Sequence, residues 1–445
     1  MFRIIFTIVL FSIALKLNGQ ATENFRYADS LTYSLYIEKS WNKLISAGNN
    51  AIKNGHDYYY LRMRIAIAYY EKHNYVKSAE HFRIALELNT NDQIALEYLF
   101  YSYYLSGHSY QAQSLMPLFY PQNRDRIVNE SKLRKNIITF ESFFSDSGTD
   151  DIISDPDAYF SDREAGSQIV TKYFINNSVS ASHIIGNHVS YYHAFTNLLK
   201  ENHLHYFDGS ISADLLSQRV IQNQYYASLN FFTSTGWIIS PSFHFITAGY
   251  PLISISTSGM NSSAKTYNVR SNGYFAGTAI SKNTGFIVIG AEAGYSHINF
   301  LSQVHGTASF MVYPSGNSDI YIGAKVSAGM EIESSLSDLK IVSGFTGGFS
   351  IARKVWMELS GLMGEMNNYV SDNGLYIYNS PDILHSRFSG RIIIPVQKDG
   401  ITIFAGGGIS TYSSELIPED GQISFSTNKL SYNSNNFTGG ISWKF

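Results

Sequence analysis

The hydrophobic pattern of the chain changes its period about a third of the way along. Up to about residue 126, apolar residues recur at the spacing of amphipathic helices, and farther on apolar and polar residues alternate. Between residues 319 and 331, for example, Ile320 and Ile322 fall on one face of an extended chain, whereas Lys325 and Ser327 fall on the other. This pattern predicts a helical region followed by strands that have one apolar and one polar face.

About fourteen alternating segments follow residue 136, and the connections between them are alternately short and long, with long loops expected at 199–220, 251–265 and 367–385. Tight turns on one side and long loops on the other are typical of bacterial outer-membrane barrels. The expected segments are 137–145, 167–180, 186–198, 221–235, 236–250, 266–281, 284–296, 301–313, 319–331, 338–352, 354–366, 386–398, 400–412 and 436–445.

We therefore predict an all-β transmembrane antiparallel β-barrel of about 14 strands, within a range of roughly 12 to 16, over residues 137–445. A soluble sandwich or propeller also has alternating strands. Such a domain usually carries about 25% charged residues, whereas this chain has 15% charged and 15% aromatic residues. Closure into a barrel is favoured because every backbone amide inside a membrane needs a partner.

Residues 1–21 are expected to be a secretory signal peptide. Arg3 provides a positive start, an apolar run extends from Ile4 to Leu15, and Gly19 and Ala21 are small residues suited to cleavage. The helical region 22–126 would then lie in the periplasm, with a linker at 127–136 before the barrel. The expected location of the protein is the bacterial outer membrane.

The helical region contains a repeat of 34 residues, the period of tetratricopeptide repeats. The unit 59–92 shows it best, with Ile65 and Tyr69 in its first half and Phe82 and Ala85 in its second half. About three such units fit into the helical region, which therefore resembles a short all-α tetratricopeptide-repeat domain.

The resemblance implies a concave groove that binds a periplasmic protein partner. Tyrosines at helical spacing are also common in packed cores, so a plain spacer is the alternative interpretation of this region. The partner-binding positions that the register implies are Tyr60, Met63, Ile67, Tyr70, Tyr101 and Tyr104.

Several charged residues occupy the positions on the polar face of their predicted strands. In a barrel of this width, that face would line a lumen. Cations outnumber anions among them, so the lumen would favour anionic or polar solutes. The alternative is that these groups form salt bridges that stabilise the wall. The expected pore-lining residues are Lys172, Arg270, Glu292, Lys325, Lys340, Glu358, Arg387 and Arg391.

The sequence contains little that indicates catalysis or a cofactor. It has no cysteine, a net charge of −3, and no phosphate-binding, hydrolase or metalloprotease motif. Five of the 13 histidines lie within 183–205, without a spacing that completes a known ligand set. We therefore expect no catalytic residues, no metal, no cofactor and no nucleic-acid partner.

Repeats followed by a barrel resemble the architecture of YaiO-type outer-membrane barrels and of exopolysaccharide export porins. The resemblance implies a porin-like channel, embedded in outer-membrane lipid, that exports a polysaccharide or another polar solute. Two alternatives remain open. One is a non-conducting surface-binding or scaffold barrel that acts through its extracellular loops, and the weaker one is an enzyme at the barrel lip.

Overall fold

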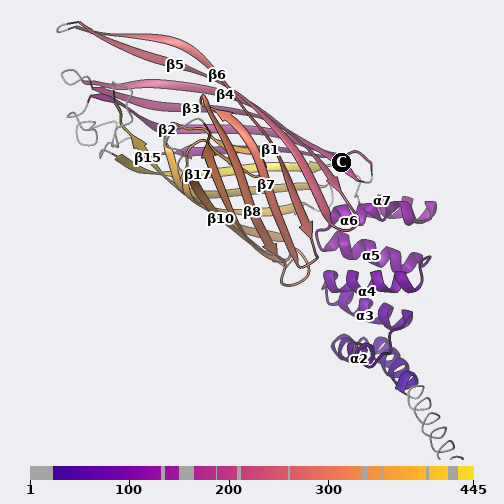
Figure 1. Cartoon of the computed structure of the whole chain (residues 1–445). Helices are drawn as coiled ribbons and strands as arrows, with labels where there is room; N and C mark the ends of the chain where they lie inside the picture. Colours follow the sequence, from indigo (N-terminus) through magenta and orange to yellow (C-terminus); the bar gives the residue numbers. More distant parts are fainter. Residues whose placement is uncertain are drawn as a thin grey trace, which may run out of the picture. The chain divides into compact units, whose positions relative to one another are not determined.

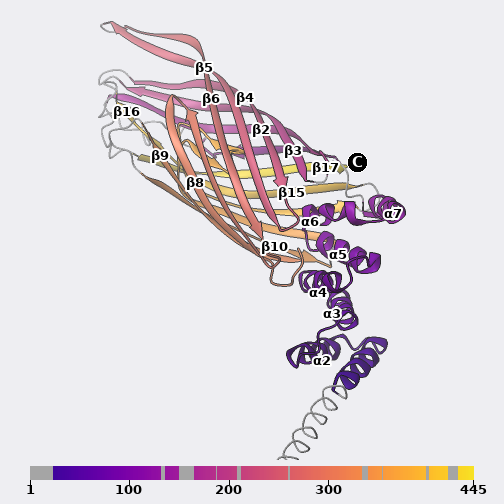
Figure 2. The same cartoon turned by 45° about the vertical axis from the view of Figure 1, so that its right-hand side comes forward.

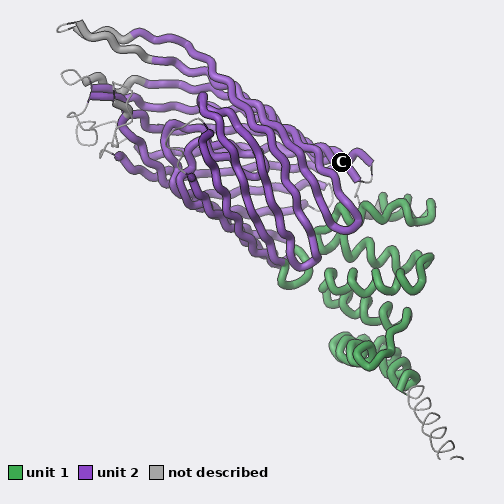
Figure 3. Tube along the Cα trace, in the orientation of Figure 1, with its two compact units in different colours: residues 1–131, 313–318 green, residues 132–312, 319–445 purple. Residues whose placement is uncertain are grey.

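The computed structural model describes residues 24–131, 136–149, 165–186, 188–207, 212–258, 261–332, 339–352, 354–396, 400–418 and 429–445. The chain divides into two compact units, one of residues 1–131 with 313–318 and one of residues 132–312 with 319–445 (Figure 3). We describe each unit separately. The expected signal peptide, 1–21, lies outside the described residues.

The first unit is helical, and its helix starts recur after 34 residues. Starts at 41, 75 and 109 form one series, and starts at 59 and 93 form another. Among the described residues, no helix is both long and apolar enough to cross a bilayer. Residues 24–37 are helical, followed by α2 (Trp41–Lys53), α3 (Tyr59–Glu71), α4 (Tyr75–Leu88), α5 (Gln93–Leu105), α6 (Ser109–Ser114), the 3₁₀ helix η1 (Met116–Leu118) and α7 (Pro121–Ser131).

Local sequence explains where several of these helices begin and how they pack. Asp92 caps α5 by accepting hydrogen bonds from the backbone N–H groups of Ile94 (2.7 Å) and Ala95 (2.9 Å). Leu44 and Ile65 are fully buried between consecutive helices. Helix α7 continues to Ser131, so the first half of the linker expected at 127–136 is helical instead.

The second unit is a closed antiparallel β-barrel of fourteen strands, as the sequence predicts (Figures 1 and 2). Strand β1 pairs with β2 on one side and with β17 on the other, so the sheet has no free edge. The strands are β1 (Ile137–Asp146), β2 (Gly166–Ile184), β3 (Val189–Phe207), β4 (Ser212–Phe232), β5 (Trp237–Ser258), β6 (Asn261–Asn283), β7 (Ile287–Ile298), β8 (Leu301–Val312), β9 (Ile320–Glu331), β10 (Lys340–Ile351), β11 (Val355–Met366), β14 (Ile383–Val396), β15 (Ile401–Glu415) and β17 (Lys429–Lys444).

The outer face of this barrel is apolar. On β9, Ile322 and Val326 are 60% and 52% exposed, whereas Ser327 on the inner face is buried. A closed sheet with an exposed apolar surface is stable only in a membrane, and an even number of antiparallel strands is the bacterial outer-membrane form. The protein therefore belongs in the outer membrane, as expected, and the chain enters the barrel at the end with short turns, which faces the periplasm in such proteins.

The strands β3 to β6 are longer than expected. They run through most of 199–220 and 251–265, which the sequence analysis assigned to long loops. A strand needs only about 9 to 11 residues to cross the membrane, so these four extend well beyond it. Figures 1 and 2 show β5 and β6 running past the neighbouring β7. The expectation failed because the alternation of apolar and polar residues, from which the strands were predicted, fades in these stretches of the sequence.

Candidate lumenal site

The connection between β11 and β14, residues 367–382, folds into the barrel. We call it the lumenal segment. It contains its own two-stranded sheet, β12 (Tyr369–Ser371) and β13 (Tyr376–Tyr378), which is not hydrogen-bonded into the barrel sheet. The sequence predicts a long connection here, at 367–385, and the structure shows that it turns inward.

The turn between β12 and β13 reaches strands on one wall. The backbone N–H of Asn373 donates to Glu292 Oε2 on β7 (2.9 Å), and Ser242 Oγ on β5 donates to Asn373 O (2.6 Å). His244 Nδ1 donates to Gly374 O (2.5 Å). Gly374 has φ +88°, and Phe275 Cδ1 lies 2.1 Å from the position that a Cβ would occupy there. Only glycine fits this turn, because both the backbone angle and the Phe275 ring exclude a side chain.

Strand β9 contacts the same segment through a charged pair. Lys325 Nζ lies 2.7 Å from Asp372 Oδ1 and donates to Ser371 Oγ (2.8 Å). The hydroxyl of Tyr369 donates to Ser327 Oγ (3.0 Å). The contacts of β5, β7 and β9 together hold the tip of the segment inside the lumen.

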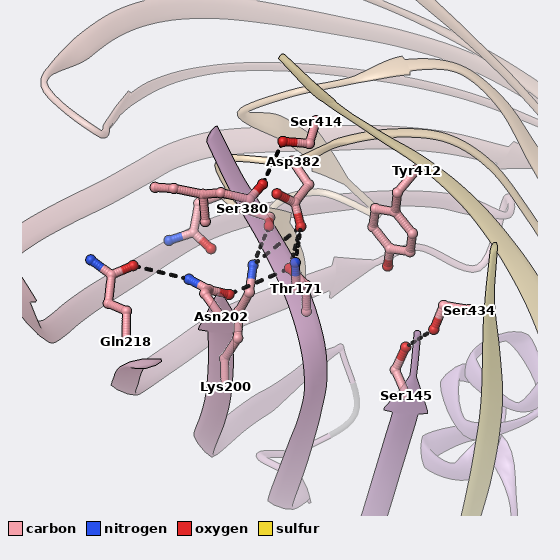
Figure 4. A network of polar contacts seen from close by, with 12 residues as sticks. Ser145, Thr171, Lys200, Asn202, Gln218, Ser380, Asp382, Tyr412, Ser414 and Ser434 are labelled. Carbon is pink, nitrogen blue, oxygen red and sulfur yellow. Dashed lines mark hydrogen bonds and ion pairs between the residues drawn. The ribbon is translucent and has the colours of Figure 1, made fainter. Parts of the chain in front are cut away.

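The other end of the segment is attached by Asp382, which Figure 4 shows among its polar partners. The side chain of Asp382 is fully buried. Its Oδ2 accepts hydrogen bonds from the backbone N–H (3.1 Å) and hydroxyl of Thr171 and from the hydroxyl of Tyr432. Lys200 Nζ lies 3.9 Å from the same oxygen and donates to Ser380 Oγ. The Thr171 N–H is available because a β-bulge follows this residue in β2.

The lumenal segment separates two cavities. The first cavity, of about 240 Å³, is lined mainly by β1 to β4 and by residues 375–382. The second cavity, of about 570 Å³, is lined by β1, β7 to β11, β14, β15 and β17. Five residues line both cavities and so mark the junction between them, namely Glu141, Phe143, Tyr376, Tyr378 and Arg387.

Arg387 lies between aromatic rings at this junction. Its guanidinium carbon is 5.2 Å from the ring centroids of Phe143 and Tyr378. The Nε–H donates to Ser410 Oγ (3.2 Å), and the two terminal nitrogens donate to the hydroxyls of Tyr378 (3.5 Å) and Tyr412 (3.4 Å). These contacts hold the guanidinium in place, and no carboxylate of the described residues pairs with it.

Most of the other expected pore-lining cations lie beside a carboxylate. Lys340 is 3.1 Å from Glu331, and Arg391 is 2.7 Å from Glu358, which also accepts a hydrogen bond from Tyr321. Four carboxylates and three cations line the second cavity, so the described walls do not form the net positive path that the sequence analysis expected. The paired arrangement agrees with the alternative of wall-stabilising salt bridges.

One expected pore-lining residue, Arg270, lies on the outer face. Arg270 is exposed and shares its strand parity with Tyr274 and Ile280, which are exposed on the outer face, while Phe275 faces inward. The parity was misassigned because the expected strand began at 266, inside a region where the alternation is weak. Lys172 lies at the β-bulge of β2, which interrupts the alternation used to place it.

The expected partner-binding residues of the helical unit differ in exposure. Tyr60 is 66% exposed, whereas Met63 is only 9% exposed and belongs to the core rather than to an open surface. The ring of Tyr70 packs against Tyr98, with centroids 5.1 Å apart. The four other expected positions are half-buried, namely Ile67, Tyr70, Tyr101 and Tyr104.

The histidine-rich stretch does not form a metal centre in the described part of the chain, where no group of three or more ligating side chains occurs. His183 and His193 contact each other across β2 and β3, with 3.2 Å between their Nε2 atoms. His188 lies in the turn between these strands, where its Nδ1 donates to Phe232 O (3.1 Å).

Sequence reasoning missed the residues that attach the lumenal segment. Asp382, Lys200 and Thr171 come from three distant parts of the chain, and none has a motif around it. The nearest signal was the turn-forming run Ser371-Asp372-Asn373-Gly374 in the middle of a long loop. This run predicts a tight turn but not its insertion.

The fold and this site define an outer-membrane β-barrel whose lumen is occupied by an inserted extracellular connection. No protein-family model and no curated protein match the chain. The structure is similar to the Ralstonia pickettii toluene transporter TbuX, with a TM-score of 0.45, 7% identity, and 70% of this chain and 90% of that chain covered.

Two further solved structures are similar at the same coverage of this chain. A Pseudomonas aeruginosa FadL homologue matches with a TM-score of 0.42 and 8% identity over 70% of this chain and 90% of that one. A bacterial polysaccharide outer membrane secretin matches with a TM-score of 0.36 and 8% identity over 70% and 99%. Similarity at this level does not bear on function.

Proposed function

We propose that the protein is a passive outer-membrane channel for small solutes and that the lumenal segment gates it. The observation that carries this proposal is the position of residues 367–382, which divide one lumen into two cavities that share a junction. Fourteen strands make a lumen wide enough for a channel, so the segment decides whether a continuous path exists.

The contacts of the segment are suited to a gate. They are hydrogen bonds and ion pairs to side chains of several strands, including Lys325 and Lys200, and they can exchange for water when the segment moves. The two-stranded sheet β12–β13 is not part of the barrel sheet, so its movement breaks no barrel hydrogen bond. The barrel therefore remains closed and lipid-embedded in both states.

Cavity size favours small solutes over polymers. The cavity of about 570 Å³ is in the range of sites for single small molecules, and the cavity of about 240 Å³ is smaller still. A polysaccharide chain needs an unbroken path, so export of a polymer would require the whole segment to leave the lumen. Gated passage of a small polar solute requires only a local displacement near the junction.

The test is conductance of the purified full-length protein in planar bilayers. Residues 368–381 are replaced by a short Gly-Ser linker in one variant, and folding of the barrel is verified by its heat-dependent gel shift. We expect rare or small openings for the wild type and a large, steady conductance for the variant. A correctly folded variant that does not conduct would refute the channel.

The second candidate is a non-conducting scaffold barrel. The observation that favours it is the number of strands that hold the segment, since β2, β3, β5, β7, β9 and β17 all contribute polar contacts. In that case the wild-type protein stays closed under every condition, and only removal of the segment opens it. Solute-dependent opening of the wild type supports the channel instead.

We also propose that the helical unit recruits a periplasmic protein. Tyr60 is 66% exposed beside Tyr59, with ring centroids 5.0 Å apart, and Ile94 on the next repeat is 64% exposed. Exposed aromatic and aliphatic side chains of this kind are frequent anchors of protein interfaces. A photo-crosslinking residue at Tyr60 should trap a partner in cells, whereas the same residue at the charged position Glu87 should not.

A further inference from the structure

Among the residues that the structure describes, the junction between the two cavities contains one cation and one anion that form no ion pair. Lys200, Lys325, Lys340 and Arg391 lie 3.9, 2.7, 3.1 and 2.7 Å from a carboxylate, respectively. Arg387 contacts only hydroxyls and aromatic rings. Among the described residues, it therefore forms no ion pair, unlike the other lumenal cations.

The guanidinium of Arg387 has hydrogen-bonding capacity left. It carries five N–H groups, and three of them point to Ser410, Tyr378 and Tyr412. One N–H on each terminal nitrogen remains, and a carboxylate is the acceptor that forms the strongest hydrogen bonds with guanidinium N–H groups. The long hydrogen bonds to the two tyrosines, 3.5 and 3.4 Å, leave the terminal nitrogens open to a stronger acceptor.

Glu141 is the matching anion. It lines both cavities, and its Oε1 accepts one hydrogen bond, from Thr438 Oγ1 (3.1 Å). In the described part of the chain, Oε2 has no partner. Phe143, two residues along β1 on the same inner face, packs against the Arg387 guanidinium. Side chains two residues apart on a strand are neighbours on one face, so Glu141 and Arg387 both lie next to Phe143, at the junction that both residues line.

We propose that this junction binds a small zwitterion of the α-amino acid class. The inference rests on the proposed channel function and identifies the solute. The carboxylate of the solute takes the two remaining N–H groups of Arg387, and its ammonium group donates to Glu141. The rings of Phe143 and Tyr376 line the space beside them and receive the apolar part of the solute.

Other classes of solute fit the junction less well. A simple anion would satisfy Arg387 but leave Glu141 without a counter-ion, and a simple cation would do the reverse. A hydrocarbon would leave both charges without a partner. A zwitterion neutralises both at once and brings no net charge into the lumen.

The test is calorimetric binding to the full-length protein in detergent with three related probes. L-Alanine carries both charges, propionate lacks the ammonium group, and ethylamine lacks the carboxylate. We expect L-alanine to bind at least tenfold more tightly than either of the other two, because each loses one charge-assisted contact. Equal binding of propionate and L-alanine, or no binding of any probe, would overturn the proposal.

Two variants test which residue binds the carboxylate of the solute and which binds its ammonium group. Arg387→Met should reduce L-alanine binding to the level of ethylamine, and Glu141→Gln should reduce it to the level of propionate. Arg219→Met is the matched control, because Arg219 is an exposed arginine of β4 that lines neither cavity, and it should leave binding unchanged. A loss of binding in the control equal to that in Arg387→Met would contradict the assignment.

Measuring both binding and conductance distinguishes a failure of the zwitterion site from a failure of the proposed channel. If the wild type opens and the barrel with the linker conducts steadily, but L-alanine does not bind, the zwitterion site is wrong and the channel remains. If L-alanine binds with the expected dependence on Arg387 and Glu141 but no variant conducts, the site stands and the channel is wrong.

Discussion

Asp382→Asn tests directly how the lumenal segment is held in the barrel. The substitution preserves the size of the side chain and an oxygen that can accept from Thr171 and Tyr432, but removes the charge that lies 3.9 Å from Lys200 Nζ. Both side chains are buried, with 8% exposure for Lys200 and 0% for Asp382. The variant therefore leaves Lys200 as a buried cation without a carboxylate.

The expected magnitude follows from that burial. Removing one partner of a buried ion pair costs about 3 to 5 kcal/mol, and about 1.4 kcal/mol corresponds to a tenfold change in an equilibrium. The ratio of detached to attached segment should therefore rise by roughly two to three orders of magnitude. Replacing both charges, in Asp382→Asn with Lys200→Met, should recover most of this loss, because no buried charge is then left alone.

The assay uses the absence of cysteine from the chain. A single Leu375→Cys substitution places a thiol on the lumenal segment beside the first cavity, and its labelling by a bulky maleimide reports the detached fraction. Labelling should be fast in Asp382→Asn and slow in the double variant. The control is Lys429→Met, which breaks a 3.0 Å ion pair of two half-exposed side chains and should cost at most about 1 kcal/mol.

Two results would refute this reasoning. One is labelling of Asp382→Asn at the wild-type rate, which would mean that the charge does not hold the segment. The other is a double variant that labels faster than either single variant, which would mean that the two charges act independently. Fast labelling in the control variant Lys429→Met would show that the labelling rate reflects general movement of the loops rather than detachment of the lumenal segment.

Three further predictions concern the turn, the lipid face and the helical unit. Gly374→Ala should detach the segment, because the Phe275 ring and the φ of +88° both exclude a Cβ, and the same cysteine labelling should show it. Val326→Lys on the lipid face should cost about 2 to 4 kcal/mol in urea titrations of barrel folding, whereas Ile351→Lys at the end of β10 should cost about 0 to 1 kcal/mol; equal costs would contradict the membrane placement. Burial lowers the pKa of His81 to about 4, so the helical unit should be fully stable above pH 6.5 and lose up to about 3 kcal/mol as the pH falls from 6.5 to 4. Urea unfolding of the helices followed by circular dichroism at both ends of that range should show the loss, and His81→Phe should abolish it.

The site was only partly predictable. Glu292, Lys325, Glu358, Arg387 and Arg391 were expected to face the lumen from strand parity alone, and each lines at least one cavity. Their pairing could not be predicted, because the partners belong to other strands or to the lumenal segment. Arg270 was placed incorrectly because its strand alternates weakly there. The prediction for Lys172 relied on a parity that a β-bulge interrupts.

The sequence by itself determined the class of fold. Alternation with a period of two places the apolar residues on one face of a strand, whichever strands lie beside it. Because every backbone N–H and C=O group must have a partner in lipid, such strands can cross the membrane only as a closed barrel. The period of 34 residues in the sequence recurs in the helix starts of the structure, at 41, 75 and 109 and at 59 and 93. Only the tertiary structure decided that residues 367–382 enter the lumen, since hydrogen bonds such as those of Asp382 with Thr171 and Tyr432 join residues 211 and 50 positions apart. Such contacts depend on which strands become neighbours when the barrel closes, and a local sequence pattern cannot predict this.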